Sequence, residues 1–149
     1  MKSKKQEDVE ITQVKSNEGE QVSGLQFFEN RIQAGFPSPV QGEFAESIDL
    51  NRALITNPAA TFCARVMGDS MVDAGINEGD LLIIDRSLKP HDGSVAVCFV
   101  DGEFTVKRLS VRDGKVFLSP ANATYPELCV SENNNFMVWG IVSHIIKKV

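Results

Sequence analysis

One short stretch of the sequence could present a nucleophile. Gly68-Asp69-Ser70-Met71 follows an apolar run, and the glycine allows a tight turn that would expose Ser70 at the end of a strand. Backbone N–H groups beside such a serine can stabilise a developing oxyanion. An ordinary polar turn is the alternative, because Gly, Asp and Ser are common turn residues.

A serine hydroxyl needs a base, and the chain offers two kinds. The histidines are His91, in a turn, and His144, in an apolar strand, and no spacing ties either one to Ser70 as a Ser-His-Asp triad. Lys107 is the other option, since a neutral amine can accept the hydroxyl proton. Burial favours that neutral form over the ammonium ion.

The strand pattern around Lys107 leaves its surroundings open. Phe104 and Val106 point to one face of the predicted strand, while Thr105, Lys107 and Leu109 point to the other. A solvent-facing lysine in an amphipathic strand is therefore the alternative to a catalytic one.

The elements that must position these residues are mostly short strands. Residues 61–66 alternate between apolar and polar side chains, and residues 80–85 form an apolar run that is typical of a strand buried on both faces. Asp101-Gly102 and Asp113-Gly114 are two-residue hairpin signals. Residues 135–146 add one or two more strands. We therefore expect an all-β barrel or sandwich.

The residues before these strands have a different composition. Residues 1–25 hold few apolar side chains, which predicts a flexible arm. Residues 26–33 could form one or two helical turns. Prolines keep residues 34–39 extended. Residues 49–55 are predicted to form a short helix with Asp49 as its N-cap.

Composition limits the classes of protein. The chain has 149 residues, of which 42% are hydrophobic, and this suits one domain with a tail. The net charge of −5 gives no electrostatic footprint for nucleic acid. Three cysteines without a C-x-x-C pair indicate neither a disulfide framework nor a zinc site, and no metal or cofactor is expected. The sequence shows no signal peptide or membrane-length apolar run, so we expect a soluble, cytoplasmic protein with no membrane partner.

Six motifs in order connect the chain to a known family. They are AGFPSP, IDLN, GDSM, GDLLIID, DGEFTVKRL and GIVSHIIK. Over residues 31–149 the chain resembles the LexA/UmuD family of self-cleaving serine peptidases, and within it the UmuD-like SOS mutagenesis proteins. The serine and lysine motifs, 37 positions apart, are specific only in combination. The resemblance implies an all-β fold, a small twisted barrel or sandwich of the LexA/signal-peptidase type with a flexible N-terminal arm.

The same resemblance implies roles for particular residues. Ser70 would be the nucleophile of a Ser-Lys dyad and Lys107 its general base. The backbone N–H groups of Asp69 and Ser70 would form the oxyanion hole. The bond that is cleaved would join Ala34 to Gly35, a small residue followed by glycine.

The resemblance also implies how the protein is processed and which partners it has. Residues 1–34 would be the arm removed by self-cleavage, and residues 35–149 the β-rich peptidase and dimerisation domain. The RecA filament on single-stranded DNA would stimulate cleavage. The processed homodimer would serve as accessory subunit of a UmuC-like Y-family translesion polymerase.

The sequence argues against other functions of this fold. A LexA-type repressor, the main alternative, needs a DNA-binding domain ahead of the cleavage site. The 34 residues there are mostly polar, hold five Lys/Arg and six Asp/Glu, and do not suit a helix-turn-helix, so no direct sequence-specific DNA binding is expected. A signal peptidase would need a membrane anchor. A non-enzymatic scaffold would not need the serine, the lysine and the Ala-Gly bond.

Overall fold

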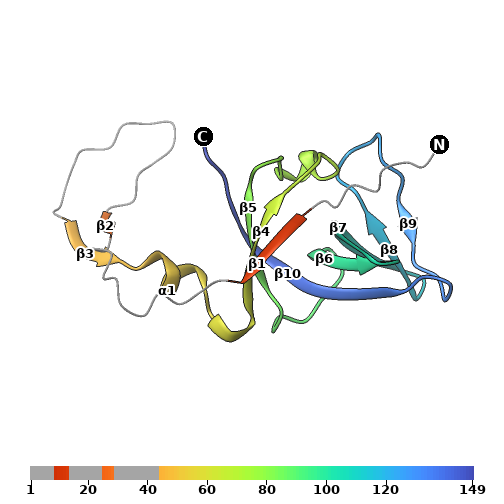
Figure 1. Ribbon diagram of the computed structural model, residues 1–149, viewed down its shortest axis with the longest axis horizontal. Helices are drawn as coiled ribbons and strands as arrows, with labels where there is room; N and C mark the ends of the chain where they lie inside the picture. The colour runs from red at the N-terminus through yellow and green to blue at the C-terminus, as the bar shows by residue number, and fades with distance from the viewer. Residues whose placement is uncertain (1–8, 14–24, 29–43) are drawn as a thin grey trace. The chain divides into compact units, whose positions relative to one another are not determined.

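The structure is a computed structural model that describes residues 9–13, 25–28 and 44–149. The chain forms two compact units. The larger unit holds β1 and all strands from β4 onward, and the smaller holds β2, β3 and α1 (Figure 1). The functional residues predicted at Asp69, Ser70 and Lys107 belong to the larger unit. Ala34 and Gly35 lie outside the described residues.

An antiparallel sheet forms the larger unit, with strand order β1-β4-β5-β10-β6-β7-β8-β9. Its strands are β1 (Val9–Gln13), β4 (Thr61–Val66), β5 (Leu81–Asp85), β6 (Val95–Val100), β7 (Glu103–Arg112), β8 (Lys115–Ser119), β9 (Leu128–Cys129) and β10 (Phe136–Ile146). β1 stands at one end of this order and yet packs near β7, so the sheet curls back on itself. The prediction of an all-β fold is confirmed.

Two tight hairpins lie where the sequence predicts them. Asp101-Gly102 joins β6 to β7, and Asp113-Gly114 joins β7 to β8. Both residues of each turn have positive φ, from 48° to 90°, as a type I′ turn requires. These turns fix the register of β7 against both neighbours, and thereby the face on which Lys107 lies.

The last strand joins two parts of the sheet. β10 pairs with β6 through Phe136–Ile141 and with β5 through Ile141–Ile146. Its register shifts once between Val138 and Gly140 and again between Val142 and His144. Such bulges bend a strand and increase its twist, which allows β10 to follow both neighbours around the curled sheet.

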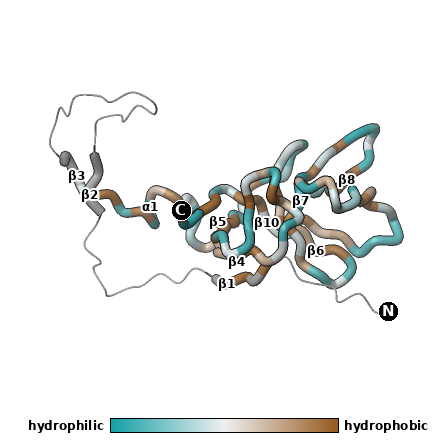
Figure 2. The backbone as a smooth tube through the Cα atoms, turned by 90° about the horizontal axis from the view of Figure 1, so that it is seen from above, coloured by the Kyte–Doolittle hydropathy of each residue, from teal (hydrophilic) through white to brown (hydrophobic). Residues whose placement is uncertain are grey.

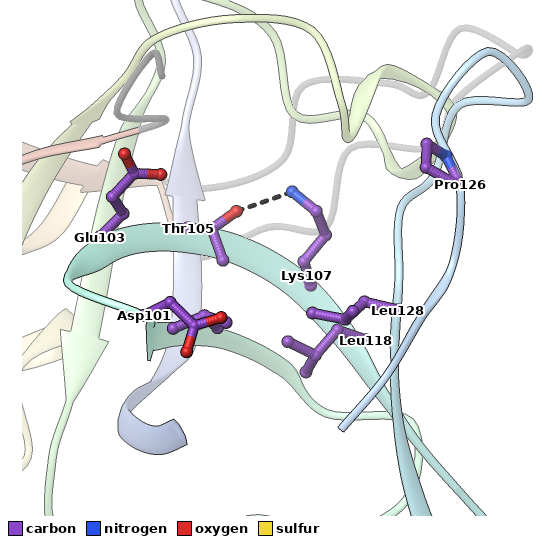
Figure 3. Close-up of a pocket in the computed structure, with 8 residues that line it drawn as sticks. Asp101, Glu103, Thr105, Lys107, Leu118, Pro126 and Leu128 are labelled. Atoms are coloured by element: carbon purple, nitrogen blue, oxygen red, sulfur yellow. Dashed lines mark hydrogen bonds between the residues drawn. The ribbon is translucent and has the colours of Figure 1, made fainter. Parts of the chain in front are cut away.

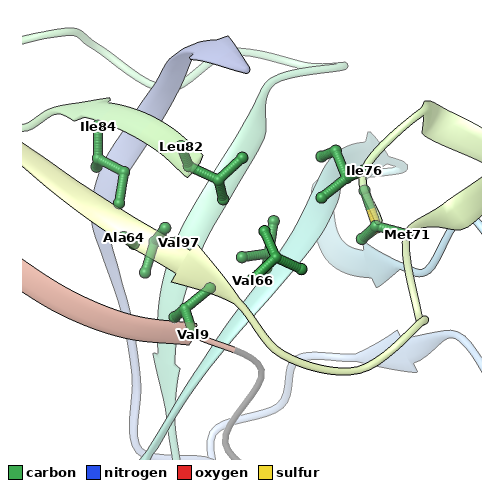
Figure 4. Packing of buried hydrophobic residues seen from close by; sticks show 9 residues of the cluster. Val9, Ala64, Val66, Met71, Ile76, Leu82, Ile84 and Val97 are labelled. Carbon is green, nitrogen blue, oxygen red and sulfur yellow. The ribbon is translucent and has the colours of Figure 1, made fainter. Parts of the chain in front are cut away.

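Hydrophobic side chains pack on both faces of the sheet. The main cluster includes Leu82, Ile84 and Val97, all with no exposed surface (Figure 4). A second cluster on the other face of β6 and β7 includes Ala96, Cys98 and other buried residues. Figure 2 shows the hydrophobic stretches along the strands and the hydrophilic ones in connecting loops. Residues 81–85 are mostly buried, which confirms the prediction of a strand covered on both sides.

Residues 1–25 are predicted to form a flexible arm, and the structure differs at residues 9–13. Val9–Gln13 forms β1, which pairs in register with β4, and Val9 is only 2% exposed. An edge strand needs only one apolar face, and Val9 and Ile11 supply it by alternation. The predicted boundary at residues 34 and 35 concerns cleavage rather than packing, and it stays a prediction.

The smaller unit contains a hairpin and a helix. β2 (Leu25–Phe28) pairs with β3 (Phe44–Ile48), so the helical turns predicted from residue 26 are wrong for residues 26–28. α1 (Leu50–Leu54) begins after Asp49, whose carboxylate accepts hydrogen bonds from two backbone N–H groups as predicted for an N-cap. Among the helices of the described ranges, none is long and apolar enough to cross a membrane.

The C-terminal end of β10 is attached to the core by a charged contact. The Asp80 carboxylate accepts hydrogen bonds from Lys147 Nζ and from the Asn77 N–H. The hydrogen bond from Lys147, and to a smaller extent the one from Asn77, holds the pKa of Asp80 below its usual value. Because the folded-state pKa is the lower one, this contribution to stability is present at neutral pH and is lost as the pH falls through it.

We predict that Asp80→Asn lowers the thermal unfolding midpoint at pH 7 by roughly 2–5 °C. The difference from the unsubstituted protein should shrink below about pH 4, where the carboxyl is protonated first in the unfolded state and, at lower pH, in the folded state too. Circular dichroism melts between pH 3 and pH 8 measure this difference. Asp113→Asn, at an exposed turn position that suits either residue, is the matched control. A difference that stays constant with pH would contradict the assignment.

Candidate active site

Ser70 lies in the turn that follows β4. Gly68 has a φ of 82°, in the left-handed region that favours glycine, and this lets the chain reverse direction just before Asp69 and Ser70. Met71, 2% exposed, packs with Ile76 in the main core (Figure 4). Ser70 itself is only 5% exposed. The buried neighbour therefore holds the serine at the surface of the core rather than in a loose polar turn.

Lys107 reaches Ser70 from the middle of β7. Its Nζ lies 3.0 Å from Ser70 Oγ, which is within hydrogen-bond distance. The same nitrogen lies 2.7 Å from Thr105 Oγ1 and 3.1 Å from the carbonyl oxygen of Val106. The structure thus brings together the two side chains that the sequence singled out, and Lys107 is half-buried rather than pointing to solvent.

The two faces of β7 have different neighbours. Phe104 and Val106 pack on the main core, whereas Leu109 belongs to the second cluster, as the alternation predicts. Lys107 lies opposite Ala96, and Thr105 lies opposite Cys98, so these side chains share one face. Lys107 therefore stands at the edge of an apolar cluster.

A small pocket opens beside Lys107. Its volume is about 260 Å³. Its lining joins polar and charged residues from the β6–β7 hairpin to apolar ones from β6, β8 and β9 and the loop before β9: Val100, Asp101, Glu103, Thr105, Lys107, Leu118, Pro126 and Leu128. In Figure 3, Glu103, Thr105 and Lys107 follow one another along the β7 ribbon, and Leu118 and Leu128 lie beneath Lys107. The amine thus lines a hollow that could receive an extended chain.

A segment far along the sequence holds the Ser70 turn from outside. Asn122 Nδ2 donates a hydrogen bond of 2.9 Å to the carbonyl oxygen of Asp69. The Tyr125 hydroxyl donates to Asp69 Oδ1 at 2.5 Å. The Ala121 N–H points to Met71 Sδ at 3.3 Å. Residues on both sides of Ser70 are therefore fixed by residues 121–125.

Sequence reasoning did not single out residues 121–125. Their composition, Ala-Asn-Ala-Thr-Tyr, carries only a turn signal, and hydrogen bonds across more than 50 positions leave no local pattern. Within the described residues, these partners of Asp69, an oxyanion-hole candidate, could be found only in three dimensions.

The histidines have other surroundings. His91 lies in an exposed turn, with its ring Nδ1 2.9 Å from the carbonyl oxygen of Asp92. His144 is exposed on β10, with Nδ1 2.9 Å from Ser143 Oγ. The structure therefore gives both rings neighbours other than Ser70, and the lysine is the base candidate in contact with it.

A buried thiol lies on the same face as the lysine. Burial raises the pKa of the Cys98 thiol to about 12, an effect that the nearby positive charge of Lys107 only partly offsets. Cys98 therefore stays protonated near neutral pH and does not compete with Ser70 as a nucleophile. Cys129, by contrast, is exposed.

Comparison with known proteins gives the chain clear relatives. The family described as Peptidase S24-like matches residues 26–143. The chain is 43% identical to protein ImpA of Escherichia coli over 121 residues, which cover 81% of this chain and 82% of ImpA. It is 39% identical to protein MucA of Escherichia coli over 130 residues, or 87% of this chain and 88% of MucA.

A repressor is also similar. The chain is 30% identical to LexA repressor 2 of Pseudomonas syringae pv. tomato over 118 residues. These cover 79% of this chain but 58% of the repressor. The similarity therefore spans most of ImpA and MucA and a smaller share of the repressor.

We predict that the cysteines differ in reactivity in the way that their burial implies. Iodoacetamide at pH 8 should modify Cys129 in the folded protein and leave Cys98 unmodified until the protein is denatured. Peptide mass mapping of timed samples measures the order, and Cys129→Ser isolates the remaining thiols. Modification of Cys98 in the folded protein as fast as that of Cys129 would contradict the packing behind Lys107.

Proposed function

The chain belongs to the peptidase S24-like family of serine peptidases, and we propose that it is a UmuD-like SOS protein that cleaves its own Ala34-Gly35 bond. The observation that carries the proposal is the 3.0 Å distance between Ser70 Oγ and Lys107 Nζ. A serine and an amine at this distance are what a Ser-Lys dyad requires.

The neighbours of Lys107 suit a neutral amine. Such an amine has two N–H donors and one lone pair. The donors can serve Thr105 Oγ1 and the Val106 carbonyl, which leaves the lone pair directed at the Ser70 hydroxyl. In that state Ser70 donates its proton to Lys107 as its oxygen attacks.

The reaction proceeds in two steps. Ser70 Oγ attacks the Ala34 carbonyl carbon while its proton passes to Lys107, and the backbone N–H groups of Asp69 and Ser70 stabilise the oxyanion. Lys107 then gives the proton to the nitrogen of Gly35 as the peptide bond breaks, which leaves an acyl-enzyme on Ser70. Water, deprotonated by Lys107, hydrolyses this ester and restores the hydroxyl.

The substrate is a segment of the chain itself. Residues 34–39 contain two prolines, which favour the extended conformation that a cleft beside a strand can accept. Ala34 and Gly35 are small enough to let the backbone approach Ser70. The apolar part of the pocket, around Leu118 and Leu128, offers surface to neighbouring side chains of the segment. Because the cleavage segment and Ser70 belong to one chain or to one dimer, the reaction is effectively unimolecular.

Regulation follows from the same chemistry. The cleavage segment must be delivered to Ser70, and an activator can help only by favouring the competent state. We assign that role to the RecA filament on single-stranded DNA. Cleavage would release residues 1–34 and leave residues 35–149, a cytoplasmic homodimer that serves a UmuC-like Y-family translesion polymerase in SOS mutagenesis.

The second candidate function is a LexA-type SOS repressor, which the similarity to a LexA repressor supports. The greater share of ImpA and MucA that the chain matches favours the UmuD-like assignment. Binding of the full chain to promoter DNA in a mobility-shift assay would distinguish the two, since the proposed function predicts no sequence-specific shift.

Self-cleavage should depend on both members of the dyad. With RecA, ATP and single-stranded DNA, intact-mass measurements should show fragments that end at Ala34 and begin at Gly35. Ser70→Ala should abolish these fragments, and Lys107→Ala should slow their formation at least about 100-fold. Lys115→Ala, which removes an exposed lysine of β8, is the matched control and should cleave normally. Cleavage that survives Ser70→Ala would refute the assignment of the nucleophile.

Alkaline pH should accelerate self-cleavage without an activator. Only the deprotonated amine can accept the Ser70 proton, so the rate should rise about tenfold for each pH unit while the ammonium form predominates. Timed gels from pH 7 to pH 10 measure the rate, and Lys107→Ala should lose the dependence. A rate that is flat or falls over this range would count against the neutral lysine.

A further inference from the structure

We propose that Asn122 is a positioning residue that turns the Asp69–Ser70 peptide so that its N–H faces the substrate carbonyl. The inference rests on the proposed function, because it concerns the oxyanion hole of that reaction. It adds to that function a residue outside both catalytic motifs, 52 positions beyond Ser70.

The geometry of one peptide unit carries the argument. Asn122 Nδ2 donates a hydrogen bond of 2.9 Å to the carbonyl oxygen of Asp69. That carbonyl and the Ser70 N–H belong to the same peptide group, which is planar and trans, as no cis bond occurs in the described chain. The C=O bond and the N–H bond of this group therefore point in opposite directions. By holding the C=O, Asn122 fixes the Ser70 N–H on the side away from itself.

Asn122 is in turn held in one orientation. Its Oδ1 accepts hydrogen bonds from the Thr124 N–H at 3.0 Å and from Thr124 Oγ1 at 2.8 Å. Because the oxygen end of the amide is occupied by donors, the NH₂ end must be the one that faces Asp69. The side chain is thus a rigid bridge between its own turn and the peptide before Ser70.

The segment that carries Asn122 is anchored at two points. Tyr125 holds the side chain of Asp69, so the backbone and the side chain of that residue are both fixed from the same segment. Further along, the Glu127 carboxylate accepts a hydrogen bond of 2.6 Å from Ser119 Oγ and pairs with Arg112. Residues 121–127 therefore connect the β7–β8 hairpin to the Ser70 turn.

The alternative is that Asn122 only stabilises the fold. The Asp69 carbonyl also accepts a longer hydrogen bond of 3.4 Å from the Val72 N–H. Without the shorter bond from Asn122, only this contact holds the peptide. The peptide can then rotate and withdraw the Ser70 N–H from the oxyanion while Ser70 Oγ and Lys107 Nζ stay in place. A positioning role therefore predicts a slower reaction at every pH with the same pH dependence. A structural role predicts a lower unfolding temperature, or a changed pH dependence if the dyad itself is disturbed.

Asn122→Asp removes the hydrogen-bond donor of the side chain and keeps its acceptor. The carboxylate still accepts from Thr124 but cannot donate to the Asp69 carbonyl. We expect self-cleavage to slow about 10- to 100-fold from pH 7 to pH 10, with the midpoint of the pH profile and the unfolding temperature unchanged. Asn122→Ala removes the donor without adding charge and should give the same loss. Asn133→Asp, in another exposed turn, is the matched control.

Several results would contradict the positioning role of Asn122. Unchanged cleavage in both Asn122 variants would overturn the inference while leaving the proposed function intact. A slower reaction with a shifted pH midpoint, or with a parallel fall in the unfolding temperature, would also overturn it. Absence of cleavage by the unsubstituted chain, at alkaline pH and with RecA on single-stranded DNA, would overturn the proposed function and this inference with it.

Discussion

The contact between Ser70 Oγ and Lys107 Nζ is the constraint on which the rest of the site depends. A hydroxyl and an amine must meet within hydrogen-bond distance although one stands in a turn and the other on a strand. Register makes this possible: the Asp101-Gly102 and Asp113-Gly114 hairpins fix which face of β7 carries Lys107. A slip of one residue would send the amine to the opposite face, into the main core.

Much of this arrangement follows from local sequence. Turn dipeptides, alternation in β4 and β7, and the Asp49 cap act over a few residues, so the hairpins, the faces and the short helix could be predicted. The pairing of Ser70 with Lys107 was different. Pattern alone left a polar turn and a solvent-facing lysine open, and only the family resemblance joined them before the structure placed them 3.0 Å apart.

The features that sequence reasoning missed depend on distant partners. β1 carries only a short alternation of Val9 and Ile11 in a polar segment, and it forms because β4 offers it an edge and the core offers a place to Val9. β2 takes its strand conformation from its pairing with β3 rather than from helical periodicity. Asn122 and Tyr125 act on Asp69 across more than 50 positions. Each of these contacts exists only once the chain has folded, which is why local patterns did not suffice to predict it.

The position of β10 in the sheet has a consequence for when the site can exist. In the strand order of the described residues, β1, β4 and β5 stand on one side of β10, and β6 to β9 stand on the other. Ser70 follows β4 and Lys107 lies on β7, so β10, which is synthesised after both, joins the half with the serine to the half with the lysine. A nascent chain that has not yet added β10 therefore lacks the strand that aligns its two halves. Synthesis itself therefore delays assembly of the pair until β10 has been made.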